Sequence, residues 1–161
     1  MNHLEQLTSE WLEYRGYIVR RNIHVGRRDN GGYEGELDIV AFHPETNHLF
    51  HIELSMDAHD WTKREKRFQK KFESGKKYII KEIFPWLLDK NPDIEQWAVI
   101  WASDKNHKKI SEGKMIPIKD FYKLIGNYIK DIRNGKIEGN AIPEHFPLLR
   151  TMQFAIHWCK E

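Results

Sequence analysis

Two acidic side chains, Asp38 and Glu53, occupy matching positions in neighbouring segments that alternate between apolar and polar residues. The segments are residues 35–42 (GELDIVAF) and 49–55 (LFHIELS), and turn-type residues 44–47 (PETN) lie between them. Period-two alternation on both sides of a turn predicts a β-hairpin. A symmetric turn then places the two acids opposite each other on one face. The other, core-facing side is expected to carry Leu37, Ile39, Ala41, Phe50, Ile52 and Leu54.

Two opposed carboxylates repel, typically by some tenths of a kcal/mol up to about 1 kcal/mol in an exposed hairpin. A raised pKa on one acid, a basic partner, or a hard divalent cation bound by both would compensate. The plainer alternative is that the acids diverge into water or meet Lys or Arg. His51 shares their face, where it would act as an acid, as a ligand, or only in surface packing. The sequence contains no H-x-x-x-H or C-x-x-C spacing, so an oxygen-only site favours Mg²⁺ or Mn²⁺ over zinc.

An amphipathic helix is predicted over residues 4–14, where Leu4, Leu7, Trp11 and Tyr14 recur at three- and four-residue spacing. At 100° per residue, Glu5 falls at the edge of the buried arc, so it is the helix acid best placed to look inward. The alternative is that Glu5 is a first-turn acid favoured by the helix dipole.

The remaining elements follow from the same periodicities. A strand over 17–23 leads into a turn-prone, basic loop over 26–32, and a basic helix follows the hairpin. We expect further elements over 78–88 (helical, interrupted at Pro85), 97–102 (a strand buried on both faces), 114–118 (a short strand), 121–132 (a helix) and from 147 (a helix with Cys159 inward). This order predicts an α/β sandwich, one sheet flanked by helices.

Basic residues gather in two places. Arg20, Arg21, Arg27 and Arg28 suit phosphate contacts, or form a solvated surface. The helix over 57–71 has an apolar stripe of Trp61, Phe68 and Phe72. Beside that stripe lie Arg64 and Lys71, which could bend towards a site near the sheet, whereas Lys63, Lys66 and Lys70 lie on the far side.

Composition sets further bounds. The chain has 161 residues, 40% of them hydrophobic, and this length is most simply one domain over 1–161. Its net charge of +2 does not by itself demand a nucleic-acid partner. The single Cys159 excludes an intramolecular disulfide framework. The sequence shows no signal-peptide pattern and no apolar run near the ~18 residues that span a bilayer, so we expect a cytoplasmic protein without membrane contact.

Three of these features together resemble a known family. Glu5 on the first helix, followed by R-G-Y at 15–17, then G-E-L-D-I-V-A, then L-F-H-I-E-L-S, is similar to the PD-(D/E)xK nuclease superfamily. The likeness is nearest to its YraN-like and Holliday-junction-resolvase-like branches, and it covers roughly the first half of the chain. It implies a restriction-endonuclease-like core over about 1–118, with a mixed central sheet and a C-terminal helical extension over about 119–161.

The resemblance also implies a chemistry. Asp38 and Glu53 would bind Mg²⁺ or Mn²⁺, Glu5 would complete or polarise the site, and the substrate would be DNA. From the two groups of basic residues, we expect Arg27, Arg28, Arg64 and Lys71 to contact the nucleic acid. Many members of that superfamily act as dimers, so a homodimer is a further expectation. Where the family has a lysine two residues after the second acid, this chain has Ser55.

Serine cannot supply the positive charge that orients water and offsets the charge on the phosphorus. Either Lys71 or Arg64 provides that charge from the basic helix, or the metal suffices, or catalysis is lost. We therefore expect a metal-dependent deoxyribonuclease. The alternative is an inactive nuclease-fold module that binds nucleic acid or a protein partner.

Overall fold

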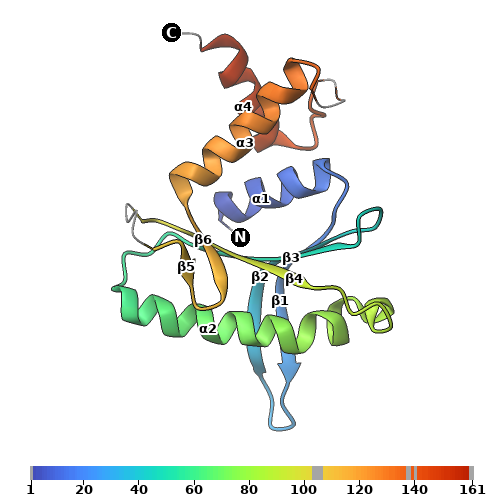
Figure 1. Cartoon of the computed structure of the whole chain (residues 1–161), viewed down its shortest axis with the longest axis vertical. Coiled ribbons are helices and arrows are strands. Elements are labelled where there is room, and N and C mark those ends of the chain that lie inside the picture. Colours follow the sequence, from blue (N-terminus) through green and yellow to red (C-terminus); the bar gives the residue numbers. More distant parts are fainter. Residues whose placement is uncertain (1, 103–106, 137–138, 140, 160–161) are drawn as a thin grey trace.

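A computed structural model describes residues 2–102, 107–136, 139 and 141–159 of the chain (Figure 1). Its centre is a six-stranded sheet in the order β1-β2-β3-β4-β6-β5. Strands β1 and β2, β2 and β3, and β5 and β6 pair antiparallel, whereas β3, β4 and β6 run parallel, so the sheet is mixed. The strands are β1 (Ile18–Arg27), β2 (Tyr33–His43), β3 (His48–Ser55), β4 (Ile94–Ile100), β5 (Lys109–Ile110) and β6 (Gly113–Pro117).

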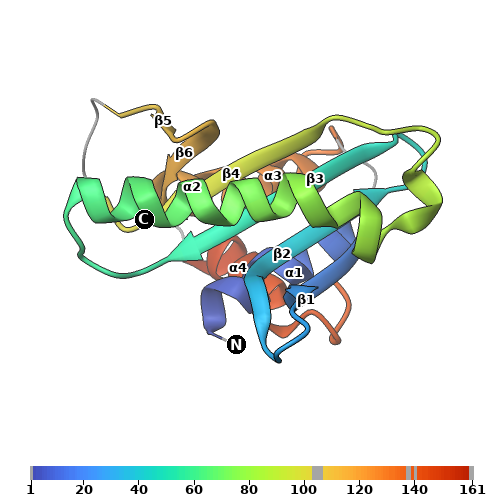
Figure 2. The ribbon, with the colours of Figure 1, turned by 90° about the horizontal axis from the view of Figure 1, so that it is seen from below.

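Helices cover both faces of this sheet (Figures 1 and 2). On one face lie α1 (His3–Tyr14) and α3 (Ile118–Arg133), with α4 (Pro147–Trp158) packed on both of them. The other face carries α2 (Trp61–Tyr78), which continues as a π-helical turn (Ile79–Ile83) and a 3₁₀ turn (Pro85–Leu87). The predicted α/β class and the interruption at Pro85 are therefore confirmed. Among the described residues no helix has the length and apolar character needed to cross a membrane.

The core is divided by the sheet. Ile39, Ala41, Phe50 and Ile52 pack with α1 and α3 on one face. On the α2 face, two clusters form, one around the π-helical turn and one around Phe68 and Phe72. Strand β4 contributes to both faces, because Trp97 and Val99 face α1 whereas Ala98 and Ile100 face α2. The expectation of an interior strand buried on both sides is confirmed.

Two expectations about packing are wrong. Leu37 was expected beside Ile39, but it lies in the α2-side cluster with Val25 and Tyr78. Asn22 of β1, which lies between the partners of Leu37 and Ile39 in the β1–β2 register, takes a left-handed conformation (φ 49°). Cys159 was expected to face the core but is exposed, because the end of α4 projects away from α3 (Figure 1).

Candidate active site

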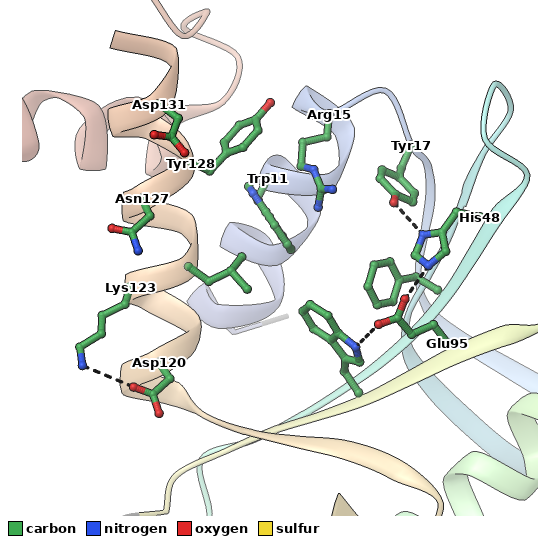
Figure 3. A pocket seen from close by; sticks show the side chains of 13 residues that line it. Trp11, Arg15, Tyr17, His48, Glu95, Asp120, Lys123, Asn127, Tyr128 and Asp131 are labelled. Carbon is green, nitrogen blue, oxygen red and sulfur yellow. Dashed lines mark hydrogen bonds and ion pairs between the residues drawn. The ribbon is translucent and has the colours of Figure 1, made fainter. Parts of the chain in front are cut away.

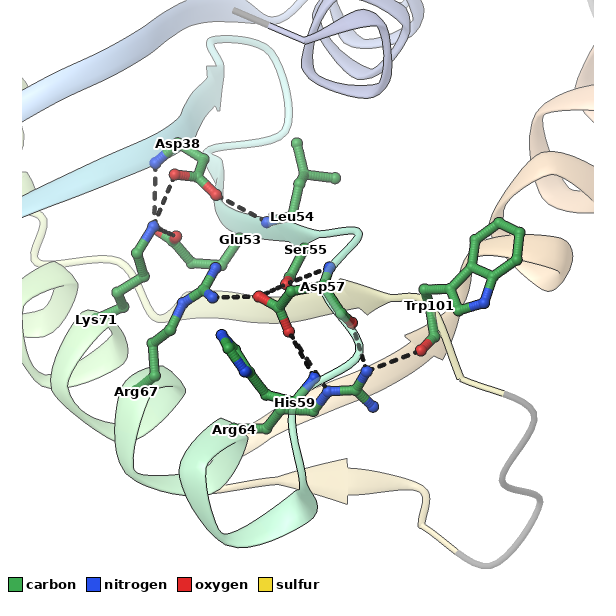
Figure 4. A network of polar contacts seen from close by, with 10 residues as sticks. All are labelled: Asp38, Glu53, Leu54, Ser55, Asp57, His59, Arg64, Arg67, Lys71 and Trp101. Carbon is green, nitrogen blue, oxygen red and sulfur yellow. Dashed lines mark hydrogen bonds and ion pairs between the residues drawn. The ribbon is translucent and has the colours of Figure 1, made fainter.

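The two acids of the hairpin meet across the β2–β3 pair. The register pairs Ile39 with Ile52, and its continuation sets Asp38 opposite Glu53. At this point each carboxylate accepts a backbone N–H from the opposite strand: the Asp38 amide donates to Glu53 Oε1 at 3.1 Å, and the Leu54 amide donates to Asp38 Oδ2 at 2.9 Å. These bonds hold both side chains in place, so the predicted cross-strand pair is confirmed (Figure 4).

A lysine from α2 joins the two acids. Lys71 Nζ donates to Asp38 Oδ1 at 2.7 Å and also to Glu53 Oε2 (Figure 4). The helix presents Phe68 and Phe72 to the sheet, and Lys71 follows at the edge of that buried stripe. Its side chain is 21% exposed, whereas Lys70 is exposed to solvent, as the angular argument predicted. Of the compensations open to opposed carboxylates, a basic partner is therefore present.

A buried chain of hydrogen bonds fixes Glu53 from behind. The Gln96 amide Nε2 donates to the carbonyl oxygen of Phe72 at 2.9 Å and lies 3.0 Å from His51 Nδ1. Only an NH₂ group can face that carbonyl, so His51 Nδ1 is the acceptor. The proton of the neutral ring is then on Nε2, which donates to Glu53 Oε1 at 2.7 Å. His51 is thus a positioning residue with no exposed surface.

The environment pushes the two carboxyl pKa values apart. Burial, followed by the charge of Glu53, raises the pKa of Asp38 to about 7 despite the opposing effect of Lys71. Burial also raises the pKa of Glu53, but the hydrogen bond from His51 and the charge and hydrogen bond of Lys71 outweigh it and leave that pKa below its usual value. Burial lowers the pKa of Lys71, yet both carboxylates more than offset it, so that pKa is raised. Near neutral pH, Glu53 and Lys71 are charged and Asp38 is the group that titrates.

A second polar network lies one helical turn away (Figure 4). Ser55 Oγ donates to Asp57 Oδ2 at 2.5 Å, and Arg67 forms an ion pair with the same carboxylate. Arg64 Nη2 donates to the carbonyl oxygens of Asp57 at 2.6 Å and Trp101 at 3.0 Å. This guanidinium therefore joins the segment after β3 to the segment after β4. Sequence reasoning missed Arg67, although it precedes Lys71 by four residues and so lies on the same side of α2.

The other predicted site residues lie elsewhere. Glu5 forms a capping box with Asn2, whose Nδ2 donates to Glu5 Oε1 at 2.7 Å, as the first-turn alternative describes. Its hydrogen bonds hold the start of α1, and none of those in the described residues joins it to the acid pair. Arg27 and Arg28 are exposed at the β1–β2 turn. Arg28 lines a shallow cavity of about 370 Å³ beside α2, together with Glu34 and Lys70.

The acid pair fits a small divalent ion that needs few protein ligands. Within the described part of the chain, no group of three or more His, Cys, Asp or Glu side chains could hold a metal. Mg²⁺ usually keeps several waters and binds through one or two carboxylates and substrate phosphates. Asp38 Oδ1 and Glu53 Oε2 already converge on one cationic group, the Lys71 ammonium, so these two oxygens can share a cation.

Comparison of this chain with protein-family models, with curated proteins and with solved structures finds no match.

Proposed function

We propose that this protein is a metal-dependent nuclease that hydrolyses DNA phosphodiester bonds, with a restriction-endonuclease-like core. The observation that carries the proposal is Lys71. The resemblance to the PD-(D/E)xK superfamily lacks its lysine at Ser55, and the lysine that reaches both acids comes instead from α2. A structural role alone would not require two carboxylates and one ammonium to converge at the centre of a sheet face, because such groups lose hydration when buried.

Asp38 and Glu53 would hold Mg²⁺ or Mn²⁺. When bound, such an ion lowers the pKa of water and polarises phosphoryl oxygens. Glu53 is kept ionised by His51, and the Leu54 amide holds one oxygen of Asp38, so that Oδ1 faces Lys71. Lys71, released from one carboxylate, would donate to the attacking water or to a phosphoryl oxygen, a contribution of about 10²-fold or more.

The basic side chains around the acid pair suit a polyanion. Arg67 is 41% exposed and is held by Asp57 one turn from Lys71, which would place a guanidinium beside a bound phosphate. Arg64 is a weaker contributor on this structure, since it already donates to the backbone carbonyls of Asp57 and Trp101. Arg27 and Arg28 are exposed at the β1–β2 turn.

Cleavage assays on variants of two neighbouring lysines, Lys70 and Lys71, test the proposal. Duplex, branched and single-stranded DNA would be incubated with Mg²⁺ or Mn²⁺ and each variant. Lys71→Ala should lower the cleavage rate by about 10²-fold or more, whereas Lys70→Ala, which faces solvent, should leave it near the wild-type value. Absence of cleavage by the wild-type protein on every substrate would remove the enzymatic proposal.

A second candidate function is an inactive nuclease-fold module that binds nucleic acid or a protein partner. The burial of Glu53 favours it: the residue has no exposed surface, and its two oxygens accept from His51, Asp38 and Lys71. In that case Ser55→Lys could create weak Mg²⁺-dependent cleavage. In an enzyme with a relocated lysine, the same change should restore activity to Lys71→Ala.

A further inference from the structure

A cavity of about 670 Å³ lies across the sheet from the acid pair (Figure 3). It opens between α1 and α3 and reaches the ends of β3 and β4. Phe50 and Trp97 line it and belong to the core cluster on the α1 face, whereas Lys71 approaches from α2 on the opposite face. Its walls are largely aromatic and are formed by Trp11, Tyr17, Phe50, Trp97 and Tyr128.

Within the described residues, one cation of this cavity, Arg15, makes no ion pair. The Arg15 guanidinium stacks 4.5 Å from the ring centroid of Trp11 and 5.4 Å from that of Tyr17. Within the described residues its side chain makes no hydrogen bond and no ion pair. The rings hold the guanidinium in place by cation–π attraction, while its N–H donors remain available. A fixed guanidinium with unused donors is suited to bind a carboxylate or a phosphate.

A second donor at the same place is also unused. The indole Nε1 of Trp11 is buried and has no hydrogen-bond partner in the described part of the chain. In Figure 3 the nitrogen edge of this ring faces the gap between α1 and α3, beside Tyr128 and Arg15. A buried N–H without an acceptor typically costs about 1–3 kcal/mol. An acceptor group on a ligand that enters beside Arg15 would remove that cost.

The acids of the cavity, in contrast, have partners. Glu95 accepts from Trp97 Nε1 and from His48 Nε2, each at 2.7 Å, and Tyr17 lies 2.7 Å from His48 Nδ1. On α3, two ion pairs engage the other acids at 3.5 Å: Asp120 with Lys123, and Asp131 with Lys136. Among the charged side chains that line the cavity in the described part of the chain, Arg15 is therefore the one whose hydrogen-bonding groups remain unused.

We propose that this cavity binds a small planar ligand that carries an anionic group, with Arg15 as the anion partner and the aromatic walls against the ring. A nucleotide and an aromatic carboxylate share this chemistry. The site does not depend on the proposed nuclease function, because it is built from other residues on the other face of the sheet.

Titration calorimetry with four probes tests the ligand class: adenosine 5′-monophosphate, indole-3-carboxylate, adenosine and inorganic phosphate. At least one planar anion should bind with a Kd below about 1 mM, and adenosine or phosphate alone should bind about tenfold more weakly. Comparison of the nucleotide with the aromatic carboxylate shows whether the cavity prefers a phosphate or a carboxylate group. Absence of binding by both planar anions at about 10 mM would overturn the proposal.

Variants locate the binding. Arg15→Gln should weaken the best probe by about tenfold or more, whereas Arg133→Gln, the same change at an exposed position of α3, should leave affinity unchanged. Leu124→Trp places a large ring in the cavity lining and should abolish binding even if Arg15→Gln does not fold. Wild-type affinity in a folded Arg15→Gln protein, or in Leu124→Trp, contradicts the site.

Discussion

The two faces of the sheet bury different kinds of side chain. Under α1 and α3 the core cluster is formed by apolar and aromatic side chains, with Phe121 packed edge-on against Trp11 at 5.7 Å. Under α2, Asp38 and Glu53 of the sheet meet Lys71 of the helix, and hydrogen bonds join the three side chains. The apolar face needs only shape complementarity, whereas the charged face is stable only while every member of its network is present.

This difference separates stability from function. Replacing a well-partnered buried ion cluster by apolar groups is often neutral or stabilising, but removing one member leaves an unpaired buried charge. Apolar clusters on both faces therefore supply folding free energy, and the α2 face in addition holds the charged side chains that the proposed nuclease function would use. Substitutions on the two faces should then differ in their dependence on pH as well as in size.

The largest expected effect is that of Lys71→Met. At pH 8 this change leaves two carboxylates without their shared cation, and the free energy of unfolding should fall by about 3 kcal/mol. The loss should shrink at pH 5, where Asp38 is protonated in the folded state. Phe121→Ala on the other face should cost about 3–5 kcal/mol at both pH values, because it removes no charge. Chemical denaturation measures both, with Lys70→Met as a control expected within about 0.5 kcal/mol of wild type.

A smaller effect concerns the pH dependence that Asp38 gives to the wild-type protein. Its pKa is about 7 in the folded state against 3.8 ordinarily, so the folded state binds more protons between these values. Stability from this group therefore falls as pH rises from about 4 to 7. The pKa of Glu53 is lowered from 4.5 in the folded state, so the stability that this group contributes is lost only as pH falls below that value.

Asp38→Asn should remove that dependence. Relative to wild type, the variant should gain on the order of 2 kcal/mol in unfolding free energy between pH 5 and pH 8. Denaturant titrations at the two pH values give the difference directly. An identical pH dependence in both proteins would show that Asp38 does not titrate in this range.

The smallest effect uses one substitution on each face. A Cβ on Gly75 of α2 would lie 2.3 Å from His51 Nδ1, so Gly75→Ala must displace the ring that positions Glu53 and should destabilise by about 1–2 kcal/mol. Gly126 of α3 has only ordinary contact, 3.7 Å from Ile156 Cδ1, and Gly126→Ala should stabilise its helix by about 0.5–1 kcal/mol. In thermal melts the midpoint should fall for Gly75→Ala and rise for Gly126→Ala. A Gly75→Ala protein as stable as the wild type would contradict the tight packing behind Glu53.

Much of this arrangement could be predicted from local patterns. Alternation and turn residues predicted the β2–β3 hairpin and its register, and the helical angle of Lys71 beside Phe68 and Phe72 placed its ammonium near the sheet. These inferences hold because each depends on neighbours in sequence. The placement of Leu37 in the α2-side cluster departs from the alternation of its strand, so the periodic pattern could not predict it.

The supporting residues of the site could not be predicted, because they depend on contacts between distant segments. Gln96 meets His51 across 45 positions of the chain, and Gly75 is needed only because that ring packs against α2. Glu5 shows the role of a local contact: it is buried, as its angular position predicted, and the capping box with Asn2 engages its carboxylate.

The most direct test of the proposed function is divalent-ion binding by the acid pair. Titration calorimetry with Mn²⁺ should give binding to the wild-type protein, loss of that binding in Asp38→Asn and in Glu53→Gln, and no change in Asp120→Asn, which alters an exposed carboxylate on α3. Such a result would assign the metal to the β2–β3 pair. Wild-type affinity in both Asp38→Asn and Glu53→Gln, or no Mn²⁺ binding by the wild-type protein, would contradict it.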